Sequence, residues 1–222
     1  MKHRSTLRVL TVTAVCCAAM ALVDGVIRPG YALKSAVKLA LFLLLPMLLS
    51  LCDGDVLYWK LFRFHKRGFL AALGLGAAVY AVILGGYFLV RPFFDFSGIA
   101  GKLTENAGVD ADNFLFVALY ISFVNSLLEE FFFRGFVFTN LKRLGSRGFA
   151  YWFSALTFAL YHVAMMTGWF SPALFLLVMA GLTIGGILFN YLNERLNCVY
   201  VSWLVHMFAN FAINTIGFLL LT

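Results

Sequence analysis

The sequence predicts an all-α membrane protein: a polytopic bundle of about seven transmembrane helices, forming one integral membrane domain over residues 1–222. Three observations lead to this fold class. Hydrophobic residues make up 63% of the chain and charged residues 12%, whereas a soluble protein is about half apolar and about a quarter charged. Seven apolar stretches approach the roughly 20 residues that cross a bilayer core. The sequence also lacks the ten-residue alternation of a membrane β-barrel.

Each apolar stretch is predicted to be a helix, because a segment in lipid must satisfy its backbone hydrogen bonds internally. Turn-forming residues such as Asp53-Gly54-Asp55 and Ser171-Pro172 separate the stretches. The run Gly185-Gly186, with Gly181 four residues before Gly185, predicts close packing between helices. The stretches are Leu7–Ile27, Leu33–Cys52, Phe69–Val90, Phe114–Phe138, Phe149–Met166, Pro172–Leu192 and Val199–Leu221.

The composition excludes several other classes of protein. The net charge of +7 is distributed among apolar runs, unlike the basic face of a nucleic-acid-binding domain. We therefore expect membrane lipid, and no nucleic acid, as a partner. The four cysteines contain no C-x-x-C pair, which argues against a disulfide scaffold or a cysteine zinc site. They are interpreted as small hydrophobic residues.

The distribution of Lys and Arg predicts a cytoplasmic N-terminus, in what we expect to be the plasma membrane. In that orientation the cytoplasmic segments hold eleven of these residues, and the rule that positive charge favours the cytoplasmic side is satisfied. The basic stretch Lys2–Arg8 before an apolar run also resembles a secretory signal peptide, but we expect the first span to be retained. The outer segments hold five: Arg28, Lys34, Lys38, Arg91 and Lys102.

Ionisable residues inside spans are the candidates for function, because each is costly in lipid and needs a partner or a water-filled cavity. The first three spans offer no strong candidate, since Asp24 lies near the end of its span. Three later spans are different. They contain Glu129, Glu130 and Arg134 in the fourth, His162 in the fifth, and His206 with Asn210 in the seventh.

The spacing of the charged trio predicts two roles. Glu130 and Arg134 are four residues apart, so they lie on one helix face and are expected to form an ion pair. Glu129 lies about 100° away around the helix and is left available. At about 1.5 Å per residue from the cytoplasmic ends of their spans, Glu129, His162, His206 and Asn210 lie in one slab near mid-membrane. We therefore expect them to converge on one cavity.

Three motifs follow one another on these spans: E-E-x-x-x-R at Glu129–Arg134, F-x-x-x-H at Phe158–His162 and H-x-x-x-N at His206–Asn210. In this order they resemble the CAAX-protease and bacteriocin-processing family of intramembrane endopeptidases, also called the Abi family. The resemblance covers residues 114–214, the motif-bearing core of the same bundle. It implies an intramembrane endopeptidase that hydrolyses a peptide bond in a membrane-associated or processed peptide or protein substrate.

The resemblance also implies a role for each motif residue, under a glutamic-type mechanism. Glu129 and His162 would activate the water, and His206 and Asn210 would hold the oxyanion. The remaining motif residues would brace the site structurally: Glu130, Arg134 and Phe158.

Alternatives remain for the cofactor and for the activity. No metal is favoured, but Glu129, His162 and His206 would be sufficient ligands for a catalytic zinc. A catalytically silent relative would act as an immunity, scaffold or regulatory membrane protein. A proton-coupled transporter would also use intramembrane Glu and His, but the chain shows no inverted repeat. The sequence does not determine the substrate or the oligomeric state.

Overall fold

The computed structural model describes residues 2–56, 66–96, 98–99, 101, 102, 105 and 112–221. Over these residues the chain is helical, has no strand, and contains seven segments long and apolar enough to cross a membrane. The predicted seven-helix membrane bundle is therefore confirmed. The segments are Lys2–Ile27, Tyr31–Cys52, Gly68–Phe93, Phe114–Leu144, Arg147–Met166, Pro172–Leu196 and Val199–Leu221.

Several segments combine α-helix with short π-helical stretches. An interfacial helix expected around Tyr58–Lys66 lies outside the described residues, apart from the start of α4 at Lys66. The α-helices of the spans are α1 (Lys2–Leu22), α2 (Tyr31–Leu39), α3 (Leu45–Cys52), α4 (Lys66–Val90), α6 (Phe114–Tyr120), α7 (Ser126–Glu130), α8 (Thr139–Leu144), α9 (Arg147–Tyr161), α10 (Val163–Met166), α11 (Pro172–Leu196) and α12 (Val199–Leu221). The π-helical stretches are Val23–Ile27, Ala40–Leu44, Ile121–Asn125 and Phe131–Phe138.

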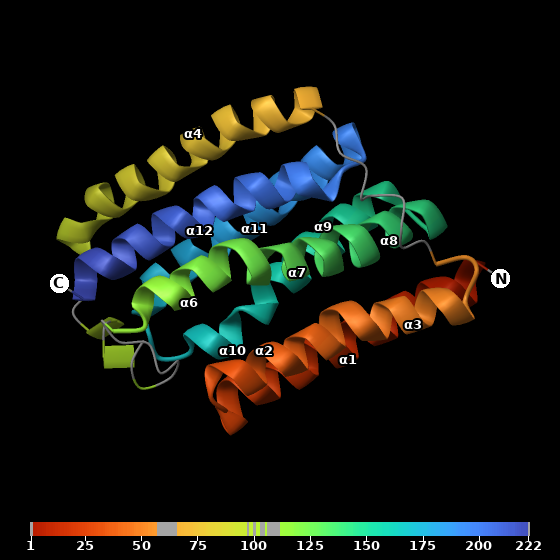
Figure 1. Cartoon of the computed structure of the whole chain (residues 1–222), viewed down its shortest axis with the longest axis horizontal. Coiled ribbons are helices and arrows are strands. Elements are labelled where there is room, and N and C mark those ends of the chain that lie inside the picture. Colours follow the sequence, from red (N-terminus) through yellow and green to blue (C-terminus); the bar gives the residue numbers. More distant parts are fainter. Residues whose placement is uncertain are drawn as a thin grey trace.

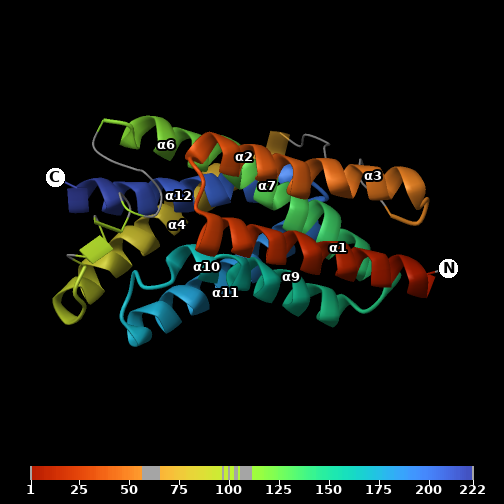
Figure 2. The same ribbon diagram turned by 90° about the horizontal axis from the view of Figure 1, so that it is seen from below.

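The spans run roughly along the long axis of the bundle, and the two termini lie at its opposite ends (Figure 1 and Figure 2). This arrangement agrees with an odd number of crossings. Helix α12 contacts α4, α7 and α11, while α1 packs against α8 and α9. The α2–α3 span contacts the α7 region through its π-helical stretch Ala40–Leu44. The fourth span therefore lies between the first two spans and the C-terminal helices.

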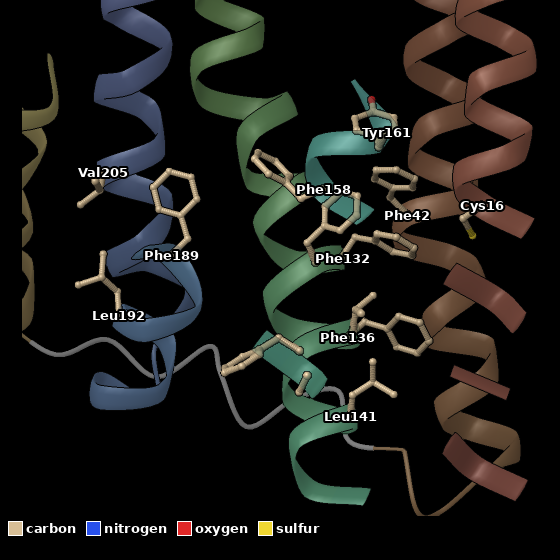
Figure 3. Packing of buried hydrophobic residues seen from close by; sticks show 14 of the residues in the cluster. Cys16, Phe42, Phe132, Phe136, Leu141, Phe158, Tyr161, Phe189, Leu192 and Val205 are labelled. Atoms are coloured by element: carbon tan, nitrogen blue, oxygen red, sulfur yellow. The ribbon is translucent and has the colours of Figure 1, made fainter. Parts of the chain in front are cut away.

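Aromatic rings fill the centre of this arrangement. Phe42, from the second span, stacks on Phe132 with ring centroids 4.2 Å apart and lies 5.3 Å from the ring of Tyr161 (Figure 3). Phe133 meets the edge of the Phe158 ring at 5.3 Å. Aromatic pairs of this kind add about 0.5–1.5 kcal/mol beyond the burial of their area. The aromatic core thus fixes the π-helical stretch Phe131–Phe138 and α9 against the second span.

The close helix packing expected around Gly185-Gly186 is present, but Gly181 and Gly185 do not make it. A Cβ atom at Gly181 would meet nothing within 4 Å, and one at Gly185 would only reach the Phe189 ring of the same helix at 4.0 Å. The neighbouring Gly186 makes the close approach, because its Cβ would lie 2.9 Å from Cα of Ala155 on α9. The spacing motif therefore indicated the right helix but the wrong face of it.

Candidate active site

The two adjacent glutamates lie on α7, a five-residue helix between the π-helical stretches Ile121–Asn125 and Phe131–Phe138. π-Helical insertions shift the register of the side chains that follow them, and they are frequent at functional sites. Both side chains are buried: Glu129 is 2% exposed and Glu130 is fully enclosed. A buried carboxylate needs a charged or hydrogen-bonding partner, and each glutamate has its own set.

The two carboxylate oxygens of Glu129 have different neighbours. Oε1 accepts hydrogen bonds from Nζ of Lys38 at 2.5 Å and from the amide of Asn125 at 3.0 Å. Oε2 faces Nε2 of His206 at 3.7 Å and Nε2 of His162 at 3.9 Å. Both distances exceed those of direct hydrogen bonds. One oxygen is therefore anchored, and the other is directed toward two imidazoles.

His162 lies at a break between α9 and α10. Its backbone N–H bonds to the carbonyl of Ala159 at 3.1 Å, and its ring atom Nδ1 lies 2.7 Å from the carbonyl of Phe158. A carbonyl only accepts, so Nδ1 carries the hydrogen in this contact and the neutral ring has a lone pair on Nε2. The predicted span Phe149–Met166 is present as Arg147–Met166, with a one-residue break at His162, whose Nε2 faces Glu129.

His206, on α12, lies between the two glutamates. Its Nδ1 is 3.0 Å from Oε1 of Glu130, so this nitrogen donates to the carboxylate while Nε2 faces Glu129. The Phe189 ring stacks on the imidazole with centroids 5.0 Å apart, and the Phe158 ring meets it edge-on at 5.7 Å. The imidazole is therefore fixed in both position and rotation.

Glu130 and Arg134 form the ion pair expected from their spacing, with Nη1 and Oε1 3.2 Å apart and neither side chain exposed. The guanidinium carbon lies 4.2 Å from the centre of the Phe158 ring and 4.9 Å from that of Phe189. Aromatic faces attract a cation, and more strongly when water is excluded. Phe158 thus contacts Arg134, His162 and His206 together.

Asn210 follows His206 by one helical turn but does not join the Glu129 contacts. Its amide donates to the backbone carbonyl of Ile121 at 3.2 Å. An amide group has two N–H donors, and this bond uses one of them. The structure therefore brings Glu129, His162 and His206 together, with Asn210 attached to the π-helical stretch beside them.

The sequence interpretation missed two members of the cluster. Lys38 was counted among the outer basic residues, but it lies inside the second span, is 4% exposed and pairs with Glu129. Removing it from the outer count increases the predicted charge asymmetry. Asn125 was not predicted as a site residue either, although it precedes Glu129 by four residues and therefore lies on the same helix face. An ionisable residue within an apolar run was the signal for Lys38.

The residues do not fit a metal centre well. Across the described part of the chain, no three His, Cys, Asp or Glu side chains are grouped so that they could hold a metal ion. The ammonium of Lys38 already neutralises Glu129 and would repel a second cation at short range. We derive no step through a metal, and the zinc alternative with Glu129, His162 and His206 stays a prediction.

The fold and this cluster define a polytopic membrane protein with a buried acid–histidine site. Residues 111–212 match the family model described as type II CAAX prenyl endopeptidase Rce1-like. The match confirms the resemblance seen in the three motifs, and the matched residues lie in the C-terminal half of the chain. Neither curated proteins nor solved structures gave a significant match. The family points to proteolysis in general terms.

Proposed function

We propose that this protein is an intramembrane endopeptidase of the glutamic type, in which Glu129 and His162 activate water. One observation carries the proposal: Oε2 of Glu129 faces Nε2 of both His162 and His206 inside a buried helical bundle. The distances of 3.9 and 3.7 Å are too long for direct hydrogen bonds and suit a polar group placed between the three atoms. A water held there would lie against a carboxylate and a lone pair of a neutral imidazole.

In the proposed reaction, Glu129 accepts a proton from the water while the water oxygen attacks the peptide carbonyl carbon. His162 orients the water through Nε2, because its Nδ1 is committed to Phe158. Collapse of the tetrahedral intermediate breaks the C–N bond, and the proton held by Glu129 passes to the leaving amine. General base catalysis by a positioned group typically contributes about 10²–10⁴-fold.

His206 and the second N–H of Asn210 are the proposed donors to the oxyanion. To donate to the oxyanion, His206 needs a proton on Nε2 in addition to the one that its Nδ1 donates to Glu130. Donors of this kind typically supply about 2.7–4 kcal/mol of transition-state stabilisation.

The substrate is proposed to be a peptide or protein segment that reaches the site from the membrane. Quantitative profiling of peptide termini in cells expressing wild type or Glu129→Gln, at matched protein levels, tests the activity. Termini produced by wild type should disappear with Glu129→Gln and persist with Glu105→Gln, a matched control in an exposed ion pair with Lys102. Identical profiles for wild type and Glu129→Gln would contradict the proposal.

The silent-relative alternative has one observation in its favour. Lys38 already binds one oxygen of Glu129, and a neighbouring cation weakens a carboxylate as a base. The other oxygen remains directed toward the histidines, so we favour catalysis. The same profiling experiment separates the two functions, because a binding protein would generate no termini that depend on Glu129.

Hydrolysis is proposed to proceed without a metal, on the argument that Lys38 supplies the positive charge beside Glu129. Purified protein treated with a chelator should therefore cleave at the untreated rate. Loss of cleavage on chelation, with recovery on adding zinc, would instead support the alternative in which Glu129, His162 and His206 bind the metal.

A further inference from the structure

Lys38 is a buried cation to which the proposed reaction assigns no step. It lies on α2, in the second span, 91 residues before its partner Glu129. A lysine held inside a span is costly, and such residues mark functional positions. Its ammonium is 5.0 Å from the centre of the Tyr161 ring and 5.5 Å from that of Phe42. The ammonium of Lys38 thus lies near one aromatic ring from its own span and one from the fifth span.

Lys38 and Asn125 contact the same carboxylate oxygen of Glu129, and they also contact each other. Nζ donates to Oε1 of Glu129 and to the side-chain oxygen of Asn125. Asn125 in turn donates to the same Oε1 at 3.0 Å. Two donors that are themselves linked therefore converge on one oxygen. The carboxylate cannot rotate about its last bond without breaking both contacts.

We propose that Lys38 is a positioning residue, which anchors Oε1 of Glu129 so that Oε2 is presented to His162 and His206. The inference rests on the proposed function, because the oriented oxygen is the one assigned to the water. A misplacement of a catalytic group by about 1 Å can lower a rate by about a hundredfold. Asn125 assists by fixing the same oxygen from within the fourth span.

The neighbouring Lys34 shows that charge on α2 is not sufficient for this role. Lys34 lies one turn earlier on the same helix and pairs with Asp24 at 2.5 Å. It thus has the same side chain, a similar ion pair and a place in the same span, but its partner belongs to the first span. This makes Lys34 the matched control for Lys38.

The test compares steady-state cleavage by wild type, Lys38→Met and Lys34→Met, each corrected for its folded fraction. Lys38→Met should lower kcat by about a hundredfold with KM near the wild-type value, whereas Lys34→Met should retain kcat. Lys38→Arg keeps the cation and should recover more activity than Lys38→Gln. A Lys38→Met enzyme with wild-type kcat, or with a higher one, would overturn the inference.

A second variant keeps the inference testable if Lys38→Met does not fold. Asn125→Ala removes the other donor to Oε1 and leaves Lys38 in place, so it should also lower kcat without changing KM. Wild-type kcat in Asn125→Ala would then overturn the inference. The outcomes are distinguishable from failure of the proposed function: a wild type that cleaves nothing removes both, whereas normal cleavage by the Lys38 and Asn125 variants removes this inference alone.

Discussion

Nδ1 of His206 lies 3.0 Å from Oε1 of Glu130, although 76 residues separate them. The glutamate expected to pair with Arg134 therefore also contacts a histidine of the candidate site. Glu130 is fully enclosed, so both contacts form where water does not compete. Its carboxylate consequently links the stability of the fourth span to the orientation of α12.

Replacing Glu130 is expected to lower both stability and activity. Glu130→Gln leaves Arg134 as an uncompensated buried charge, and breaking such a pair typically costs about 3–5 kcal/mol. It also removes the carboxylate that accepts from His206, so the imidazole loses its fixed orientation. Melting in detergent and cleavage assays on Glu130→Gln would measure the two effects separately.

The double variant Glu130→Gln with Arg134→Gln separates the two functions of Glu130. Stability should recover in part, because no buried charge is left unpaired. Activity should stay low, because His206 still lacks its carboxylate. Full recovery of activity together with stability would show that Glu130 acts on Arg134 alone.

The fold was largely predictable because length and hydropathy decide whether a segment can span a membrane. The last span, Val199–Leu221, has the predicted bounds. The first begins at Lys2 rather than Leu7, because helical hydrogen bonds continue into polar residues that hydropathy excludes. Helix ends are generally less well determined than the existence of a helix.

The site was only partly predictable, because sequence spacing describes contacts within a helix but not between helices. The Glu130–Arg134 pair follows from positions four residues apart. The Lys38–Glu129 contact depends on how the second span packs against the fourth, which no local pattern encodes. No glycine or proline marks the break at His162, so no local signal in the sequence predicted it either.

Membrane topology can be tested with single cysteines at exposed positions near the ends of the spans. With a cytoplasmic N-terminus, Gly54 and Gly148 should lie inside and Gly30 outside; a Cβ atom at each would meet nothing within 4 Å. In a Cys52→Ser background, an impermeant thiol reagent should label Gly30→Cys in intact cells but label the other two only after permeabilisation. Labelling of Gly54→Cys in intact cells would reverse the predicted orientation.

The contact between the N-terminal helix and the loop after the second span should be sensitive to pH. Burial opposes ionisation of Asp53, but hydrogen bonds from Arg8 and Ser5 outweigh it and lower the pKa of this carboxyl. A lowered folded-state pKa stabilises the protein above the unfolded-state value, and this contribution is lost as pH falls through the folded-state pKa. Because Arg8 is half exposed, we expect about 1 kcal/mol or less.

The difference in melting temperature between wild type and Asp53→Asn should therefore be largest near neutral pH and shrink in acid. Asp55→Asn is the matched control, because Asp55 contributes only its backbone N–H to the contact, at 3.1 Å from Asp53. A difference between wild type and Asp53→Asn that is independent of pH would show that the carboxylate charge does not stabilise this contact.

The close approach of α9 and α11 should make Gly186 intolerant of even one added carbon. In Gly186→Ala the new Cβ would lie 2.9 Å from Cα and 3.1 Å from Cβ of Ala155. These are backbone and near-backbone atoms, so the helices must separate, and overpacking of this kind typically costs about 1–3 kcal/mol. Gly181→Ala, in open space on the same helix, should be neutral or stabilising by up to about 1 kcal/mol, since alanine is the better helix former.

Because α9 ends beside His162, Gly186→Ala should also reduce cleavage, whereas Gly181→Ala should not. Melting and cleavage of the two variants would measure this contrast, and equal stability for both would show that the interface yields without cost.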